Sequence, residues 1–250
     1  MALHRKVEKD AGPTAADRAC EALRAAFNWL EDAELVDGVP NIRLAKKVAR
    51  AAGQRHRVLN DHEIKAIWSN LDSGAFGTIV RLLLMTGQRR GEVAQMCWIE
   101  LNGDVWEIPA ARTKNGLPHR LHHVQSVQAL IEGREQIGGY VFTTNGPTAF
   151  SGFSQSKARL DHRIGFTDWT LHDLRRAFVT RWNEMGVPPH VVEACVNHIS
   201  GIAKAGVARV YNRAEYFQER KIAMERWATE LDSIVSSGDV EASRLVVDND

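Results

Sequence analysis

The sequence predicts a mainly helical fold that carries a small antiparallel β-sheet, an α+β architecture. Two short strand-like runs, at residues 105–108 and 121–124, stand between long stretches in which apolar side chains recur at helical spacing. Asn115-Gly116 lies between the two runs and is a strong signal for a hairpin turn. We therefore expect a β-hairpin inserted between two groups of helices.

The expected helices follow from apolar spacing and from capping residues. Residues 15–36 form an amphipathic pattern, and Asn60 and Glu63 match a capping box that opens the next helix. A strongly apolar helix at about residues 76–86 is expected to be buried and to end at Gly87. Further helices are expected at about residues 126–136, 154–164, 172–184, 188–196 and 203–232, with a short strand at 140–143.

Length and composition restrict the class of protein. The chain has 250 residues, of which 44% are hydrophobic and 25% charged, which fits one large domain or one domain with a fragment. Its three cysteines are widely spaced, so we expect neither a disulfide framework nor a zinc site. The charged N-terminus is no signal peptide, and no apolar run approaches the ~20 residues of a membrane span. We expect a soluble protein of a reduced, cytoplasmic compartment.

The charge is unevenly distributed along the chain. The net charge of +1 argues weakly against a protein that coats DNA by bulk electrostatics. Residues 43–57, however, include six Lys or Arg and no acidic residue. A solvated linker and a segment that contacts phosphates explain this basic run equally well.

Three short motifs are candidates for chemistry. In T-G-Q-R-R-G-E, at 86–92, an arginine just past a helix-ending glycine is followed by Glu92; taken alone, a helix-terminus ion pair is the simpler explanation. In L-H-D-L-R-R, at 171–176, His172 and Arg175 are three residues apart and share one face of a helix. The third motif is Asn197-His198, which a glycine-containing connection joins to a later tyrosine.

Five motifs taken together resemble one family. TGQRRGE, the lysine of RTKNG, LHDLRR, VNHIS and VYNRAEY occur in the order seen in tyrosine recombinases, especially the integrases of temperate phages and genomic islands. The resemblance covers roughly residues 54–231 and implies the DNA breaking–rejoining catalytic fold. It also implies attack of a tyrosine on a DNA phosphodiester, with a 3′-phosphotyrosyl intermediate, a free 5′-hydroxyl, and no cofactor, metal or ATP.

The resemblance assigns six catalytic residues: Arg89, Lys114, His172, Arg175, His198 and Tyr211. The two arginines and His198 would hold the phosphate oxygens, because fixed donors must meet the developing charge when no metal is present. His172 would be the general base or proton relay for the nucleophile Tyr211. Lys114, on a mobile hairpin, would protonate the leaving 5′-oxygen.

Two of the three tyrosines are plausible nucleophiles. Tyr140 precedes the LHDLRR motif and is expected to serve packing. Tyr211 lies thirteen residues after His198, a little farther than is commonest in the family, so Tyr216 stays a minor rival. If both lie on one helix, five residues separate them by about 500° of rotation and they cannot share a face.

Several neighbouring residues are expected to have other roles. Family spacing selects Arg89 over Arg90 and Arg175 over Arg176. Glu92 and Asp173 are expected to orient side chains or the fold. Three histidines cluster near the hairpin, and we expect them to face solvent or the DNA backbone instead of a metal: His119, His122 and His123.

The resemblance further implies a domain organisation and partners. Residues 1–53 would be a remnant of a core-binding domain (its last helix) with a basic linker, 54–232 the catalytic domain and 233–250 a flexible tail. We expect this chain to be a truncated copy or a part of a longer protein, and to bind DNA weakly and non-specifically by itself. The expected DNA partner is a double-stranded attachment site. We expect a homo-tetramer on DNA and a monomer when the protein is free. Accessory DNA-bending proteins are possible further partners. The alternatives are a type IB topoisomerase-like relaxing enzyme and an inactive DNA-binding remnant.

Overall fold

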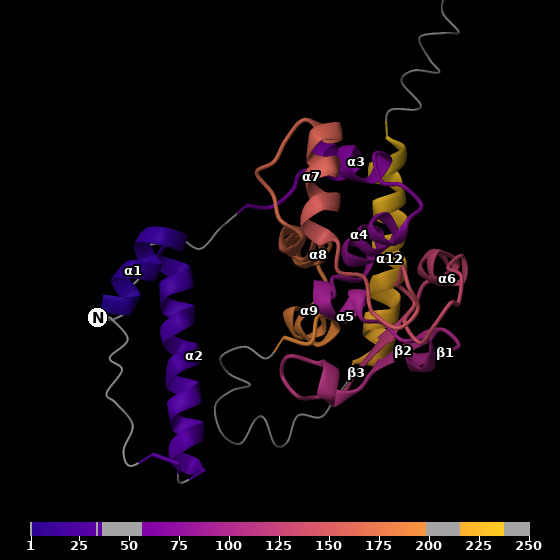
Figure 1. Ribbon diagram of the computed structural model, residues 1–250. Coiled ribbons are helices and arrows are strands. Elements are labelled where there is room, and N and C mark those ends of the chain that lie inside the picture. Colours follow the sequence, from indigo (N-terminus) through magenta and orange to yellow (C-terminus); the bar gives the residue numbers. More distant parts are fainter. Residues whose placement is uncertain (1, 34, 37–56, 199–215, 238–250) are drawn as a thin grey trace, which may run out of the picture. The chain divides into compact units, whose positions relative to one another are not determined.

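The computed structural model describes residues 2–33, 35–36, 57–198 and 216–237. The chain divides into two compact units, residues 1–56 and 57–250. The described part of each unit is coloured by sequence in Figure 1. Tyr211, most of the basic run at 43–57, the connection at 200–206 and the segment 238–250 lie outside the described residues.

The first unit contains a helical hairpin of α1, Ala2–Ala11, and α2, Pro13–Asp32. Gly12, with φ +83°, separates the two helices, and Pro13 occupies the first position of α2, where its missing N–H is tolerated. The helices pack together around the buried Ala16 and Cys20. The prediction of one helix in this region was therefore wrong: α1 was missed because five of its ten residues are charged, which obscures its short apolar stripe.

The second unit is mainly helical with one three-stranded antiparallel sheet of order β1-β2-β3, so the predicted fold class is confirmed. Its elements in chain order are α3 (Asp61–Ser69), α4 (Ala75–Thr86), α5 (Arg90–Ala94), η1 (Trp98–Glu100), β1 (Leu101–Asn102), β2 (Val105–Ile108), η2 (Ala110–Arg112), β3 (His119–His122), α6 (Gln125–Glu132), α7 (Phe153–Ile164), α8 (Leu171–Glu184), α9 (Pro189–Cys195) and α12 (Phe217–Ser236).

Helix α4 forms the centre of the core. Nearly all of its side chains are buried, and it packs against α8 and α12, which lie beside it in Figure 1. The Phe178 ring on α8 contacts Trp182 at 4.5 Å and Trp227 of α12 at 5.9 Å between centroids. The Trp227 indole N–H donates to the Leu84 carbonyl at 3.1 Å, so this buried polar group is satisfied. The predicted buried helix is thus confirmed.

Capping residues set the helix boundaries as predicted at two places. The Asn60 side chain accepts from the Glu63 amide at 2.9 Å, and the Glu63 carboxylate accepts from the Asn60 amide at 3.1 Å. This reciprocal capping box begins α3. Helix α4 ends at Gly87, which has φ +65° and donates its amide to the Leu83 carbonyl.

Substitution of Gly87 by alanine should destabilise the fold by about 2–4 kcal/mol, because a left-handed backbone and overpacking act together. A β-carbon at Gly87 would lie 2.4 Å from a ring carbon of Phe178. Gly91→Ala is the matched control, since its β-carbon would meet nothing within 4 Å. Urea unfolding measures both variants, and equal free energies of unfolding for the two would contradict the prediction.

The sheet differs in detail from the prediction. Strand β3 begins at His119, two residues earlier than expected, and pairs Trp106 with Leu121. The connection between β2 and β3 is a ten-residue loop, residues 109–118, that contains η2 and a turn at Asn115 and Gly116. The Asn115-Gly116 pair therefore lies near the tip of this longer loop and does not form a two-residue hairpin turn.

Three other boundaries were predicted wrongly. The expected strand at 140–143 is reduced to isolated bridges, which pair Cys97 with Tyr140 and Thr143 with Ala149. Helix α6 stops at Glu132, because Gly133 follows. The expected helix 203–232 is interrupted at Tyr216, which is not helical, and α12 runs to Ser236, beyond the predicted start of the tail; residues 203–215 lie outside the described residues.

Candidate functional site

Arg89 lies in the short link between α4 and α5 and points toward the end of α9. Its backbone amide and its Nη1 donate to the two Glu92 carboxylate oxygens, at 3.0 and 2.8 Å. Its Nη2 donates to the Asn197 carbonyl at 3.0 Å. Glu92 is buried and so acts as the orienting group that the sequence predicted, while the guanidinium reaches a segment 108 residues away.

Arg175 is buried on α8, with 7% of its surface exposed. Its Nη1 donates to the Gly87 carbonyl at 2.7 Å, and its Nη2 donates to the Val196 carbonyl at 2.6 Å. Burial and the neighbouring Arg89 lower the pKa of Arg175 to about 10, so it stays protonated at neutral pH. These two carbonyls fix the side chain without neutralising its charge.

The two guanidinium groups converge on successive carbonyls at the end of α9. Arg175 binds Val196, and Arg89 binds Asn197. Two like charges held close together favour an anion between or beside them, because the anion relieves their repulsion. Planar guanidinium groups also match the paired oxygens of a phosphate. The two guanidinium groups could therefore hold a phosphate between them.

The segment after α9 is shaped by Asn197, whose φ is +48°. Asparagine tolerates this left-handed conformation better than most residues. His198 follows with an exposed side chain, and its amide donates to the Glu193 carbonyl at 2.9 Å. The same segment is fixed by Gln88, whose Nε2 donates to the Cys195 carbonyl at 2.9 Å.

Gln88 is a site residue that sequence reasoning missed. Its side chain is 1% exposed, and it joins the Thr86 and Cys195 carbonyls. The available signal was its position between a helix-ending glycine and a candidate arginine, where an amide is well placed to bridge backbone groups. Gln88 therefore supports the site by holding α9 against the end of α4.

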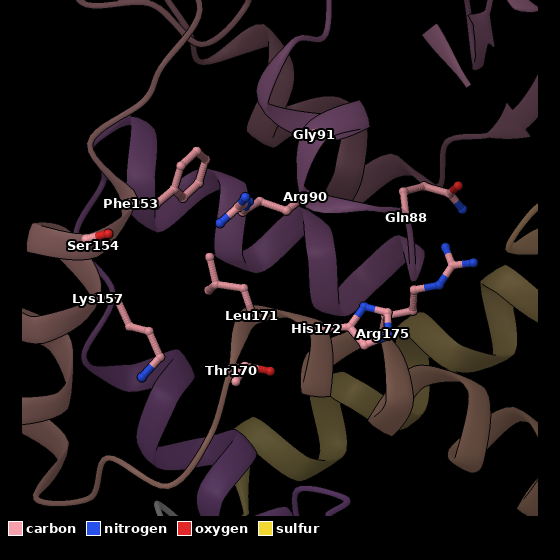
Figure 2. A pocket seen from close by; sticks show the side chains of 10 residues that line it. All are labelled: Gln88, Arg90, Gly91, Phe153, Ser154, Lys157, Thr170, Leu171, His172 and Arg175. Atoms are coloured by element: carbon pink, nitrogen blue, oxygen red, sulfur yellow. The ribbon is translucent and has the colours of Figure 1, made fainter. Parts of the chain in front are cut away.

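His172 lies one turn before Arg175 on α8, and both line a cavity of about 440 Å³ (Figure 2). Burial of part of the ring lowers the pKa of His172, and the charges of Arg175 and Arg176 lower it further, although Asp173 opposes them. His172 is therefore largely neutral at pH 7 and able to accept a proton. Asp173 is buried and caps α8 through Thr170, at 2.8 Å from its amide, which agrees with the predicted structural role.

The neighbouring arginines behave differently from the predicted pair. Arg90 is exposed and stacks on Phe153, with its guanidinium carbon 5.0 Å from the ring centroid, as Figure 2 shows. Arg176 pairs with Asp173 at 3.3 Å. Neither reaches the carbonyls at the end of α9, so the structure separates Arg89 and Arg175 from their sequence neighbours.

Lys114 lies at the tip of the loop between β2 and β3, and its side chain is exposed. Within the described residues its ammonium group has no recorded hydrogen bond or ion pair. The next residue, Asn115, donates from Nδ2 to the Asn197 side-chain oxygen at 2.6 Å. The loop is therefore docked on the segment that Arg89 binds.

The candidate nucleophile Tyr211 lies outside the described residues. Its rival Tyr216 precedes α12 with φ +48°, so it is not helical and the predicted rotation argument does not apply to it. The Tyr216 ring is half-buried, contacts the His190 ring at 4.6 Å between centroids and packs against the core. This packing favours a structural role for Tyr216.

The expectation that the three hairpin histidines face solvent or DNA was wrong, because all three are buried: His119, His122 and His123. Burial lowers the pKa of His119 to about 3 and that of His123 to about 4. Helix α12 packs against β3, with the His122 ring 6.5 Å from the Phe217 ring, whereas the His123 ring lies 6.1 Å from the Trp106 ring of β2. Among the residues that the structure describes, no group of three or more His, Cys, Asp or Glu side chains is arranged to bind a metal.

Within the part of the chain that the structure describes, no helix is both long and apolar enough to cross a membrane.

Comparisons with known proteins identify the family. Residues 57–216 match the model of the phage integrase family. The prophage integrase IntA of Escherichia coli K12 is 26% identical over 238 residues, which are 91% of this chain and 57% of that protein. The prophage integrase IntZ of the same strain is 27% identical over 246 residues, 94% of this chain and 60% of that protein. The chain thus spans about three-fifths of the length of these relatives.

Solved structures show the same fold. The integrase of mycobacterium phage Brujita has a TM-score of 0.57 at 18% identity, over 85% of this chain and 71% of that one. A lambda integrase dimer bound to a COC′ core site has a TM-score of 0.57 at 17% identity, over 85% of this chain and 64% of that one. Together with the family match over the unit that carries Arg89 and Arg175, these findings show that the chain belongs to the phage integrase family of tyrosine recombinases.

Proposed function

We propose that this chain is the DNA-cleaving part of a site-specific recombinase that integrates or excises a mobile element. Tyr211 attacks a DNA phosphodiester, forms a 3′-phosphotyrosyl bond and releases a 5′-hydroxyl. The 5′-hydroxyl of a second DNA then attacks the phosphotyrosyl phosphorus, which forms a new phosphodiester and releases the tyrosine. The observation that carries the proposal is the convergence of the Arg89 and Arg175 guanidinium groups at the end of α9. The family match supports it.

The described side chains have distinct roles in this reaction. Arg89 and Arg175, together with His198, which directly follows the Asn197 carbonyl that Arg89 binds, hold the non-bridging oxygens and stabilise the charge that develops on them. His172, neutral at pH 7 and on the same cavity as Arg175, accepts the tyrosine proton. Lys114 protonates the leaving 5′-oxygen. No step requires a metal ion or ATP, because the phosphotyrosyl bond conserves the phosphodiester linkage.

The proposed partners are double-stranded attachment-site DNA and further copies of the protein. A relative of this fold, lambda integrase, has been solved as a dimer bound to a core site and as a tetramer bound to a Holliday junction. By analogy we propose a tetramer on DNA and a monomer when free, acting in the cytoplasm of a bacterium, with accessory DNA-bending proteins as further partners.

The proposal extends to domain organisation. Residues 1–53 would belong to a core-binding domain and its linker, and the catalytic region would begin at residue 54. The boundary between the compact units, after residue 56, supports this division. Limited proteolysis should release a stable fragment that begins near residue 57.

Covalent trapping tests the proposed chemistry. The chain is incubated with a nicked attachment-site duplex from which the 5′ fragment diffuses away, so that religation is prevented. We expect a protein–DNA adduct attached through the 3′ end of the DNA. The released fragment should carry a 5′-hydroxyl that a polynucleotide kinase can label. Strand exchange between two such duplexes, instead of relaxation alone, distinguishes recombination from topoisomerase activity, and absence of any adduct would favour a DNA-binding remnant.

The rate of adduct formation should fall as the pH falls below neutrality. Because the pKa of His172 is below its ordinary 6.5, the base stays active down to that lower pKa and is lost only when it becomes protonated there. A pH–rate profile measures the midpoint, which we expect below 6.5. The side chain in the variant His172→Gln cannot titrate in this range, so its adduct formation should be slow and should show no fall in rate at low pH. If the rate of this variant still falls at low pH as in the wild type, a group other than His172 causes the fall.

A further inference from the structure

The loop that carries Lys114 is fixed by its neighbour, Asn115. The Asn115 Nδ2 donates to the Asn197 Oδ1 at 2.6 Å and lies 3.3 Å from the Asn197 carbonyl oxygen. On its other side, the Asn115 Oδ1 accepts from the Leu117 amide at 3.2 Å. A single side chain therefore closes the loop turn and docks it on the end of α9.

Asn197 receives this contact and also binds Arg89, one of the two arginines proposed to hold the phosphate. Its carbonyl oxygen accepts from Arg89 at 3.0 Å, and its side chain accepts from Asn115. Asn197 makes both contacts in a left-handed backbone conformation, with φ +48°. Arg89 and the loop tip are thus linked through one residue, across separations of 108 and 82 positions in the sequence.

We propose that Asn115 and Asn197 form an amide latch that positions Lys114 as the proton donor beside the scissile phosphate. This inference rests on the proposed function, and it assigns positioning roles to two residues that themselves touch no reacting atom. Lys114 directly precedes Asn115, is exposed and has no partner recorded within the described residues. The latch therefore holds the backbone while the ammonium group stays free to meet the leaving oxygen.

The latch explains how a proton donor on a long loop reaches a defined position. A ten-residue loop without a tip contact samples many conformations, and ordering it on each turnover would cost conformational entropy. A displacement of about 1 Å at a catalytic group can reduce a rate by roughly 100-fold. The hydrogen bonds from Asn115 to Asn197 order the loop before the reaction begins, so the entropy cost is not incurred on each turnover. They also fix the position of Lys114 relative to Arg89.

A leaving group that needs no proton tests the latch. Two nicked duplexes are compared: one with the normal 5′-bridging oxygen at the scissile phosphate, and one with sulfur in its place. A thiolate leaves without protonation, because a thiol is a far stronger acid than an alcohol. Cleavage of the sulfur duplex therefore requires Arg89, Arg175 and the nucleophile but not the proton donor.

We expect Asn115→Ala and Asn197→Gly to slow adduct formation on the oxygen duplex by roughly 10- to 100-fold, while the sulfur duplex reacts within about threefold of the wild-type rate. Lys114→Ala should show the same pattern with a larger loss. Glycine at 197 keeps the positive φ and the carbonyl that Arg89 binds, so only the side-chain amide is removed. The double variant should be no slower than the slower single variant, because both remove one interaction.

The outcomes separate the latch from the proposed function. Asn102→Ala is the matched control, an exposed asparagine in β1, and should leave both rates unchanged. Equal slowing of both duplexes by the Asn115 and Asn197 variants, multiplicative losses in the double variant, or unchanged oxygen rates would overturn the latch. If Lys114→Ala is not rescued by sulfur, the proton donor and its latch are both wrong, although tyrosine cleavage stands. If the wild-type chain forms no adduct on either duplex, the proposed function itself fails.

Discussion

Replacement of Arg175 by lysine should slow adduct formation by about 100- to 1000-fold or more, which is typical of the loss of one donor to a developing oxyanion. The guanidinium of Arg175 donates to the Gly87 and Val196 carbonyls at 2.7 and 2.6 Å, and so it is held in one orientation. A lysine ammonium keeps the charge but offers a single point donor, which cannot bind both carbonyls and present a flat edge to phosphate.

The adjacent Arg176 provides the matched control. It is half-buried, pairs with the buried Asp173 and reaches neither carbonyl, so Arg176→Lys should retain adduct formation close to the wild-type rate. Single-turnover kinetics on a nicked duplex measure both variants, and circular dichroism checks that both are folded. An Arg175→Lys rate within threefold of wild type, at saturating DNA, would show that Arg175 serves the fold and not the phosphate.

Acid should destabilise the second unit strongly, because two buried histidines are kept neutral. The pKa of His119 is lowered to about 3 and that of His123 to about 4, by burial in each case. In the unfolded chain both protonate near pH 6.5, so the unfolded state binds more protons and stability falls as the pH drops below 6.5. At pH 4.5 each histidine should remove roughly 2–3 kcal/mol of the free energy of unfolding.

His123→Phe tests this linkage. The His123 ring lies 6.1 Å from the Trp106 ring, and its buried Nε2 has no hydrogen-bond partner, so a phenylalanine ring can occupy the site. Urea unfolding between pH 7 and pH 4.5 should give a smaller pH slope than the wild type, while His119, His122 and His172, whose pKa values are also lowered, keep part of the slope. His62→Gln, on the exposed surface of α3, is the control. A His123→Phe slope equal to that of the wild type would contradict the linkage.

Local signals predicted the elements that present the site. Helix α4 and its end at Gly87 follow from an apolar run closed by a glycine, and the start of α3 follows from its capping box. Family spacing separated Arg89 and Arg175 from the arginines beside them, and the structure places only this pair against the end of α9. These features depend on residues within a few positions of one another, which the sequence displays directly.

Long-range packing explains what the sequence did not predict. The two arginines donate to the backbone carbonyls of Gly87, Val196 and Asn197. Every residue type has a backbone carbonyl, so the sequence does not indicate which residues accept these hydrogen bonds. The hairpin histidines are buried by tertiary contacts, because α12 packs against β3 and His123 lies beside the Trp106 ring. The polarity of these histidines predicted exposed side chains, and only the tertiary fold shows that they are buried.

Covalent capture of Tyr211 by DNA tests the central claim most directly. The wild-type chain, Tyr211→Phe and Tyr216→Phe are each incubated with the nicked duplex, and the adduct is digested and mapped to a single peptide. We expect wild type and Tyr216→Phe to form the adduct, because phenylalanine keeps the ring that contacts His190. Tyr211→Phe should form none. An adduct that persists in Tyr211→Phe and disappears in Tyr216→Phe would contradict the assignment and make Tyr216 the nucleophile.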